Sequence, residues 1–132
     1  MIRDGAILLV RCAFRNGQTV WMLPGGGRDE GESDDACVAR EVEEETGLSV
    51  QVERLLLDVP AEPPDGTYTR WRTYDCTVTG GDAVAGGGEG DNAELVDVKW
   101  LSLRAEGTWP ADIKTDMCLY PQLLAIRART RA

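Results

Sequence analysis

The segment from Gly26 to Leu48 reads G-G-R-D-E-G-E-S-D-D-A-C-V-A-R-E-V-E-E-E-T-G-L. It opens with glycine and polar residues and continues in a helical pattern. Ser33 is a suitable N-cap, and Asp34 and Asp35 suit the first turn, where negative charge is favourable. Gly47 is the residue type that commonly ends a helix in the left-handed conformation. The segment therefore predicts a loop, a helix from Asp34 and a stop at Gly47.

Three glutamates share one face of this predicted helix. Glu41, Glu44 and Glu45 lie at positions i, i+3 and i+4, so their side chains fall within a single turn. Like charges this close oppose full ionisation, and Arg40 alone cannot offset them. Mg²⁺ prefers such carboxylate oxygens. Three glutamates alone are more typical of a solvated acidic face, and the flanking residues decide between the two interpretations.

Those flanking residues complete a family motif. The segment resembles the Nudix box, G-x5-E-x7-R-E-U-x-E-E-x-G-U, where U is a bulky aliphatic residue. The nine specified positions are filled by Gly26, Glu32, Arg40, Glu41, Val42, Glu44, Glu45, Gly47 and Leu48. At average residue frequencies the chance of this coincidence is roughly below one in a million. The stretches 4–11, 21–26 and 94–101 resemble other parts of the family.

The resemblance implies an α/β fold, an α/β/α sandwich around a mixed sheet, in a single domain over residues 1–132. The family has a fuller first strand than Met1 to Arg3 allows, so a shortened strand or a start upstream of Met1 is expected. The residue patterns predict five strands and one further helix. The strands are Ala6 to Val10, Thr19 to Leu23, Leu48 to Leu57, Tyr68 to Thr79 and Glu94 to Leu101, and the helix is Met117 to Arg129.

The resemblance also implies a metal centre with Mg²⁺ as cofactor, for which Mn²⁺ can substitute. The implied ligands are the carbonyl of Gly25 and the carboxylates of Glu41, Glu44, Glu45 and Glu94. Glu94 is our choice for the glutamate that a later loop often supplies. Glu89 and Asp91 are the alternatives.

Further roles follow from the same resemblance. The catalytic residues would be Arg40, Glu44, Glu45 and Glu94, and the residues that shape the box would be Gly26, Glu32 and Gly47. Arg40 would orient the glutamates. Hydrolysis spreads negative charge over phosphate oxygens, which Mg²⁺ stabilises. Either Glu45 or Glu94 would accept the proton of the attacking water.

Composition excludes several classes of function. The 132 residues carry a formal net charge of −9, which argues against a nucleic-acid polymer as partner. The absence of histidine rules out a Ser-His-Asp triad and a Cys-His pair. No apolar run approaches a membrane span and no secretory signal is evident, so we expect a cytoplasmic protein. The four scattered cysteines are expected to be reduced core residues.

The substrate class is less sharply defined. Nucleoside-triphosphate pyrophosphatases of the family, which give a nucleoside monophosphate and pyrophosphate, match best. ADP-ribose, nucleotide sugars and dinucleoside polyphosphates are alternatives, the first weakly supported by Pro63 and Pro64. Candidate substrate-binding residues are Arg11, for a terminal phosphate, and Tyr68 and Trp71, for base stacking. A ligand-binding module that has lost catalysis is the alternative of another class, and a homodimer is possible.

Overall fold

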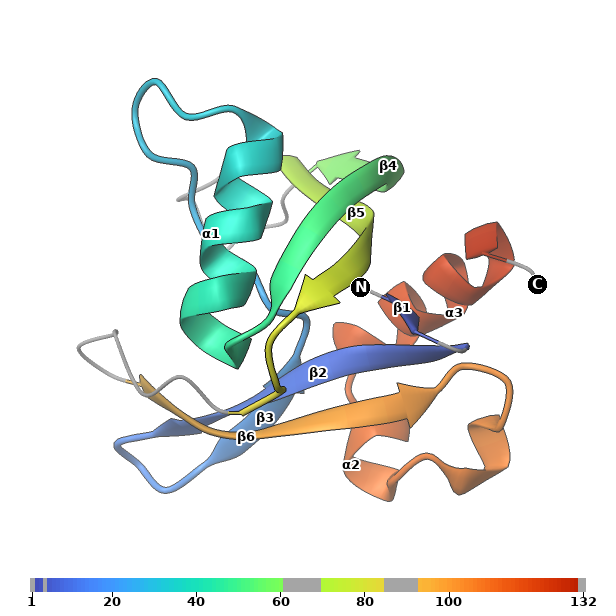
Figure 1. Ribbon diagram of the computed structural model, residues 1–132. Coiled ribbons are helices and arrows are strands. Elements are labelled where there is room, and N and C mark those ends of the chain that lie inside the picture. Colours follow the sequence, from blue (N-terminus) through green and yellow to red (C-terminus); the bar gives the residue numbers. More distant parts are fainter. Residues whose placement is uncertain (1, 4, 61–69, 85–92, 131–132) are drawn as a thin grey trace.

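The computed structural model describes residues 2–3, 5–60, 70–84 and 93–130 (Figure 1). In chain order the elements are β1 (Ile2–Arg3), β2 (Ala6–Phe14), β3 (Thr19–Met22), α1 (Asp34–Thr46), β4 (Ser49–Pro60), β5 (Arg70–Gly80), β6 (Ala93–Ser102), the 3-10 turn η1 (Glu106–Thr108), α2 (Ala111–Lys114) and α3 (Leu119–Thr130). Every predicted strand and helix is present. The structure adds η1 and α2, which the sequence patterns did not predict.

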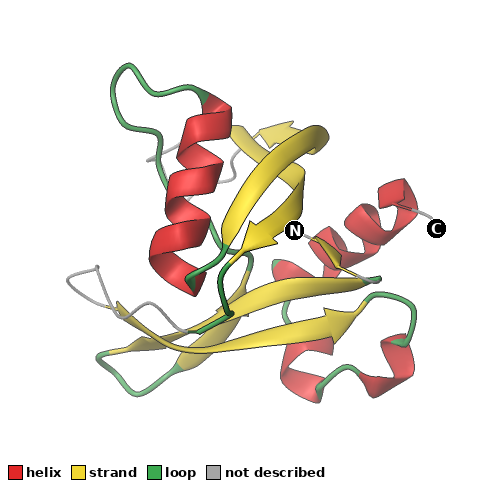
Figure 2. Cartoon of the chain, in the orientation of Figure 1, coloured by secondary structure: helices red, strands yellow, loops and turns green. Residues whose placement is uncertain are grey.

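The strands form two antiparallel sheets (Figure 2). β2 is central to the first: it pairs with β1 and β3 along one edge and with β6 along the other. β4 and β5 form the second sheet, from Ser49 opposite Gly80 to Pro60 opposite Arg70. The ladders between described residues are all antiparallel, unlike the mixed sheet expected, because β2–β3 and β4–β5 are consecutive strands that fold back on each other.

Successive residues of β2 point to opposite faces and enter two separate cores. Leu8 packs in a core with Val42 of α1 and with Cys76 of β5. Ile7 and Leu9 belong to the second core, whose helical members are Ile113, Leu119, Leu123 and Ile126. Burial of each such side chain stabilises the fold by about 1.5–3 kcal/mol. Helices therefore cover both sides of the strands, which confirms the expected α/β/α sandwich.

Both ends of α1 follow the prediction. The Ser33 hydroxyl accepts a hydrogen bond from the Ala36 amide at 3.1 Å. At the other end Gly47 has φ 75°, and its amide donates to the Glu43 carbonyl at 3.0 Å. These caps fix where the helix begins and ends, and hence which face the three glutamates occupy.

The cysteines are all free thiols, as expected. Cys12, Cys37 and Cys76 are buried, which confirms them as core residues. The prediction is wrong for Cys118, which is exposed because it precedes α3 at the surface. Among the described residues, the helices are too short or too polar to cross a bilayer.

Candidate active site

Arg40 is the centre of the polar network around the glutamates. Its Nε and Nη2 atoms donate to the two carboxylate oxygens of Glu32, at 2.8 and 3.0 Å. Nη1 donates to Glu41 at 2.9 Å and to Glu44 at 3.3 Å, and Nη2 also donates to the Gly27 carbonyl at 3.1 Å. Arg40 therefore fastens the loop that precedes α1 to the helix and holds two of the three glutamates, and its orienting role in catalysis stays a prediction.

Glu32 is the second anchor of the loop. Besides its paired bonds to Arg40, it accepts a hydrogen bond from the Asp29 amide at 3.0 Å. The hydrogen bonds from Arg40 and from this amide lower the pKa of Glu32 to about 2. A carboxylate that stays ionised over the whole working range of pH is suited to the structural role expected of Glu32, which stays a prediction.

Gly26 lies directly against Glu41. A Cβ atom at position 26 would lie 2.6 Å from the carboxyl carbon of Glu41 and 2.7 Å from both of its oxygens. Any side chain at this position would therefore displace the Glu41 carboxylate. This close approach is the physical reason for glycine at the first position of the motif.

Glu45 points from α1 toward the loop that precedes the helix. Its carboxylate accepts the Gly25 amide hydrogen at 2.9 Å. Burial, together with repulsion from Glu41 and Glu44, raises the pKa of Glu45 to about 7, although the Gly25 amide opposes this shift. The protein thus holds a half-buried carboxylate beside two other glutamates.

The donor set fits a hard divalent cation. Carboxylates at positions 41, 44 and 45 and the Gly25 carbonyl are the oxygen ligands that Mg²⁺ prefers. Among the described residues, acidic, cysteine and histidine side chains do not converge in threes around one point. The reason is that Glu41 and Glu44 are turned toward Arg40. A cation would therefore compete with Arg40 for these two carboxylates.

Glu94 belongs to a different element from the glutamates of α1. It is an exposed residue of β6, in register with Ala13 of β2. Its alternatives, Glu89 and Asp91, lie outside the described residues, so the ligand from a later loop stays a prediction.

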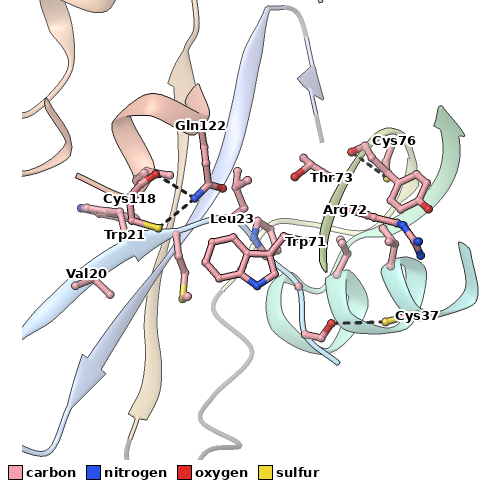
Figure 3. A pocket seen from close by; sticks show the side chains of 18 of the residues that line it. Val20, Trp21, Leu23, Cys37, Trp71, Arg72, Thr73, Cys76, Cys118 and Gln122 are labelled. Atoms are coloured by element: carbon pink, nitrogen blue, oxygen red, sulfur yellow. Dashed lines mark hydrogen bonds between the residues drawn. The ribbon is translucent and has the colours of Figure 1, made fainter. Parts of the chain in front are cut away.

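A cavity of about 600 Å³ opens beside α1 (Figure 3). Its walls come from β3, β5, α1 and the start of α3. Gly25 and Gly26 line it, and these same residues contact Glu45 and Glu41. Trp71 lies between Leu23 and Arg72 in the view of Figure 3, at a place where it can stack on a flat ring. The cavity and the glutamate cluster are therefore neighbouring parts of one site.

A second predicted substrate contact, Arg11, is not among the described lining residues. Its guanidinium packs 5.6 Å from the centre of the Trp21 ring and donates to the Thr19 hydroxyl at 3.0 Å. Its phosphate contact stays a prediction. Tyr68 lies outside the described residues, as do Pro63 and Pro64.

Sequence reasoning missed a second polar cluster at the opposite end of α1. Asp34 accepts hydrogen bonds from Arg28 at 2.9 Å, from Arg72 at 3.1 Å and from the Tyr74 hydroxyl at 2.8 Å. Two of these donors are about forty positions away in the sequence, so helical spacing gave no sign of them. The cluster joins the loop, the helix and β5 along the rim of the cavity.

This cluster predicts a dependence of stability on acid pH. The hydrogen bonds from Tyr74 and Arg72, with the charge of Arg28, lower the pKa of Asp34. A carboxylate with a depressed folded-state pKa stabilises the protein above its unfolded pKa of about 3.9, and this contribution disappears as pH falls through the folded value. Denaturation midpoints should therefore fall more steeply below pH 4 in the wild type than in Asp34→Asn. The matched control is Asp35→Asn, an exposed neighbour, and a parallel response of all three proteins would contradict the prediction.

Comparisons with known proteins agree on one family. The model of the NUDIX domain matches residues 1–117. The chain is 34% identical over 101 residues to an 8-oxo-(d)GTP phosphatase of Mycolicibacterium smegmatis, an alignment that covers 76% of this chain and 27% of that protein. It is 34% identical over 99 residues to a MutT-like protein of Streptomyces ambofaciens, covering 75% of this chain and 56% of that protein. The chain thus spans between about a quarter and somewhat over half of these relatives.

Solved structures share the fold. An ADP-ribose pyrophosphatase from Streptococcus suis aligns with a TM-score of 0.66 at 25% identity, over 99% of this chain and 87% of that one. A MutT NUDIX hydrolase from Burkholderia pseudomallei aligns with a TM-score of 0.56 at 28% identity, over 79% of this chain and 78% of that one. A UDP-X diphosphatase, at 24% identity with a TM-score of 0.61, covers 99% of this chain and 61% of its own and shares the fold alone.

Proposed function

The chain belongs to the Nudix family, and on that premise we propose that it hydrolyses a phosphoanhydride bond in a nucleoside diphosphate linked to another group. The preferred substrate in this proposal is a nucleoside triphosphate, which reacts with water to give a nucleoside monophosphate and pyrophosphate. One observation carries the proposal: Gly25 and Gly26 belong both to the cavity and to the glutamate cluster. A base held in the cavity would place its phosphates beside the carboxylates.

In this proposal Glu41, Glu44, Glu45 and the Gly25 carbonyl hold Mg²⁺, which when bound stabilises the negative charge of the phosphate oxygens in the transition state. Arg40 holds the loop that precedes α1 against the helix through its two hydrogen bonds to Glu32. Trp71 stacks on the base. A carboxylate oxygen of Glu45 accepts the proton of the attacking water, because Glu45 binds the amide of Gly25, which lines the cavity, whereas Glu94 is not among the described lining residues.

Two alternatives differ from this proposal, the first in substrate and the second in having no catalysis. Cleavage of ADP-ribose or a nucleotide sugar is favoured by the structural similarity to the Streptococcus suis enzyme. The cavity volume of about 600 Å³ is within the usual range for small-molecule sites and suits these substrates as well as a nucleoside triphosphate. A ligand-binding module without catalysis would keep the cavity and have no need of the full set of box glutamates. A homodimer and a cytoplasmic location are further predictions that do not bear on the reaction.

The test is release of pyrophosphate and phosphate from a panel of nucleotides, with Mg²⁺ present or chelated. The panel holds ordinary and oxidised nucleoside triphosphates, ADP-ribose, nucleotide sugars and dinucleoside polyphosphates. We expect Mg²⁺-dependent turnover, with a triphosphate as the best substrate and pyrophosphate as the product. Turnover best on ADP-ribose or a nucleotide sugar would support the first alternative. Binding of a nucleotide without turnover of any of them would support the binding module.

A further inference from the structure

The charged residues in the cavity lining are few and mostly basic. Among the described lining residues they are Arg70, Arg72 and Asp116. One oxygen of Asp116 accepts the amide hydrogens of Cys118 and Leu119, both at 2.9 Å, so this carboxylate is engaged in starting α3. In a chain with a net charge of −9, the cavity therefore presents its own local positive charge at one place, the β5 wall.

Arg70 and Arg72 are held in fixed positions on that wall. They lie two residues apart on β5 and therefore on the same face of the strand. Arg70 donates from Nε to the Asp58 carboxylate at 2.5 Å and from Nη2 to the Asp58 carbonyl at 3.2 Å. Arg72 donates from Nε to Asp58 at 3.4 Å and from Nη1 to Asp34 at 3.1 Å. Two aspartates thus orient two neighbouring guanidinium groups.

Each guanidinium keeps donors to spare. A guanidinium has five N–H groups, and among the described residues neither Nη1 of Arg70 nor Nη2 of Arg72 makes a hydrogen bond. With Arg28, three guanidinium groups share the two carboxylates of Asp34 and Asp58. The side chains of Arg70 and Arg72 remain 45% and 41% exposed. The rim therefore carries positive charge and guanidinium donors that bond to none of the described residues.

A purely structural role explains Arg70 poorly. Its bonds to Asp58 join two strands that the β4–β5 ladder already holds together from end to end. Exposed ion pairs of this kind also add little to stability. Arg72 does more, because it ties β5 to α1 through Asp34. Placing two oriented guanidinium groups at the mouth of a ligand cavity is better suited to recognising an anion, since the planar fork matches phosphate geometry.

We propose that Arg70 and Arg72 form a subsite for the terminal phosphate of a nucleoside triphosphate, and that this subsite selects triphosphates over sugar-linked diphosphates. The inference rests on the proposed function, whose glutamate site handles the scissile anhydride. A diphosphate between two neutral groups carries its charge only at that anhydride. A triphosphate has a further phosphate that needs a cationic partner of its own. Nη1 of Arg70 and Nη2 of Arg72, which bond to none of the described residues, supply it.

The kinetic test compares Arg70→Gln and Arg72→Gln with Arg54→Gln at saturating Mg²⁺. Arg54 is the matched control, because it lies on β4 of the same hairpin, pairs with Asp75 at 3.7 Å and does not line the cavity. We expect each cavity variant to lower kcat/KM for a nucleoside triphosphate by about 10–100-fold, mainly through KM. In the same variants kcat/KM for the corresponding nucleotide sugar should change less than about threefold. Arg54→Gln should leave kcat/KM unchanged for both substrates. Equal losses on both substrates, or no loss on either, would overturn the subsite.

A binding measurement separates this inference from the proposed function. Titration calorimetry with an α,β-methylene nucleoside triphosphate and with the matching nucleoside diphosphate needs no turnover. We expect the wild type to favour the triphosphate and Arg70→Gln to remove that preference, with an unchanged melting temperature. If the wild type hydrolyses no nucleotide but shows this arginine-dependent preference, the subsite stands and the proposed reaction fails. If the wild type hydrolyses triphosphates and the preference survives in Arg70→Gln and Arg72→Gln, the subsite fails alone.

Discussion

Glu45→Gln is expected to lower kcat by about 10³-fold while leaving the fold intact. The change preserves the size of the side chain, so its packing beside Gly25 remains possible. It removes the negative charge that would help to hold Mg²⁺ and the oxygen that would accept the proton of water. Because Glu41 and Glu44 repel Glu45, loss of its charge should not destabilise the helix. Steady-state kinetics and a thermal melt of the same sample check both halves of this expectation.

Glu43→Gln provides the matched control. Glu43 is exposed and lies on the same helix, off the face that the three glutamates share. The Glu43→Gln substitution removes the same charge from the same helical turn as Glu45→Gln, so a general electrostatic effect would appear in both variants. Calorimetric titration with Mg²⁺ then separates two roles of Glu45, because a lost ligand weakens binding whereas a lost proton acceptor does not. Activity of Glu45→Gln close to that of Glu43→Gln would reject Glu45 as an active-site residue.

Helix α1 could be predicted closely because the residues that determine its ends and its acidic face are close together in the sequence. Its N-cap, its left-handed C-cap and the spacing of its glutamates all lie within one stretch of 23 residues, from 26 to 48. The contacts of Arg40 with Glu32 and Glu41 join residues at most eight positions apart. Propensity and helical periodicity describe interactions over this range.

The cavity and its arginine rim could not be predicted in the same way. Arg72 and Tyr74 reach Asp34 only because β5 folds back against α1. The residues that oppose each other between β2 and β6 could not be predicted either, because their register shifts between Arg11 and Cys12. A bulge of this kind changes which residues oppose each other across the ladder. Strand patterns give the alternation along one strand and carry no information on such shifts.

Gly81→Ala is expected to destabilise the fold strongly. Gly81 has φ +86°, and a Cβ atom there would lie 2.3 Å from the Gly47 carbonyl oxygen. Both the positive φ and the collision involve backbone, so neither can be relieved by turning a side chain. The free energy of unfolding should fall by about 3 kcal/mol, and the melting temperature by roughly 10 °C. Denaturant titration and a thermal melt measure the two quantities.

Gly80→Ala isolates the cause of that loss, because a Cβ atom at position 80 would meet nothing within 4 Å. Its stability should stay within about 1 kcal/mol of the wild type. The collision at position 81 would push the end of β5 away from Gly47, where the Val84 amide also donates to the Thr46 carbonyl at 2.9 Å. Thr46 directly follows Glu45, so Gly81→Ala should reduce turnover even at temperatures where the protein is fully folded. Equal stability of the two alanine variants would show that the contact between Gly81 and the end of α1 does not hold the helix in place.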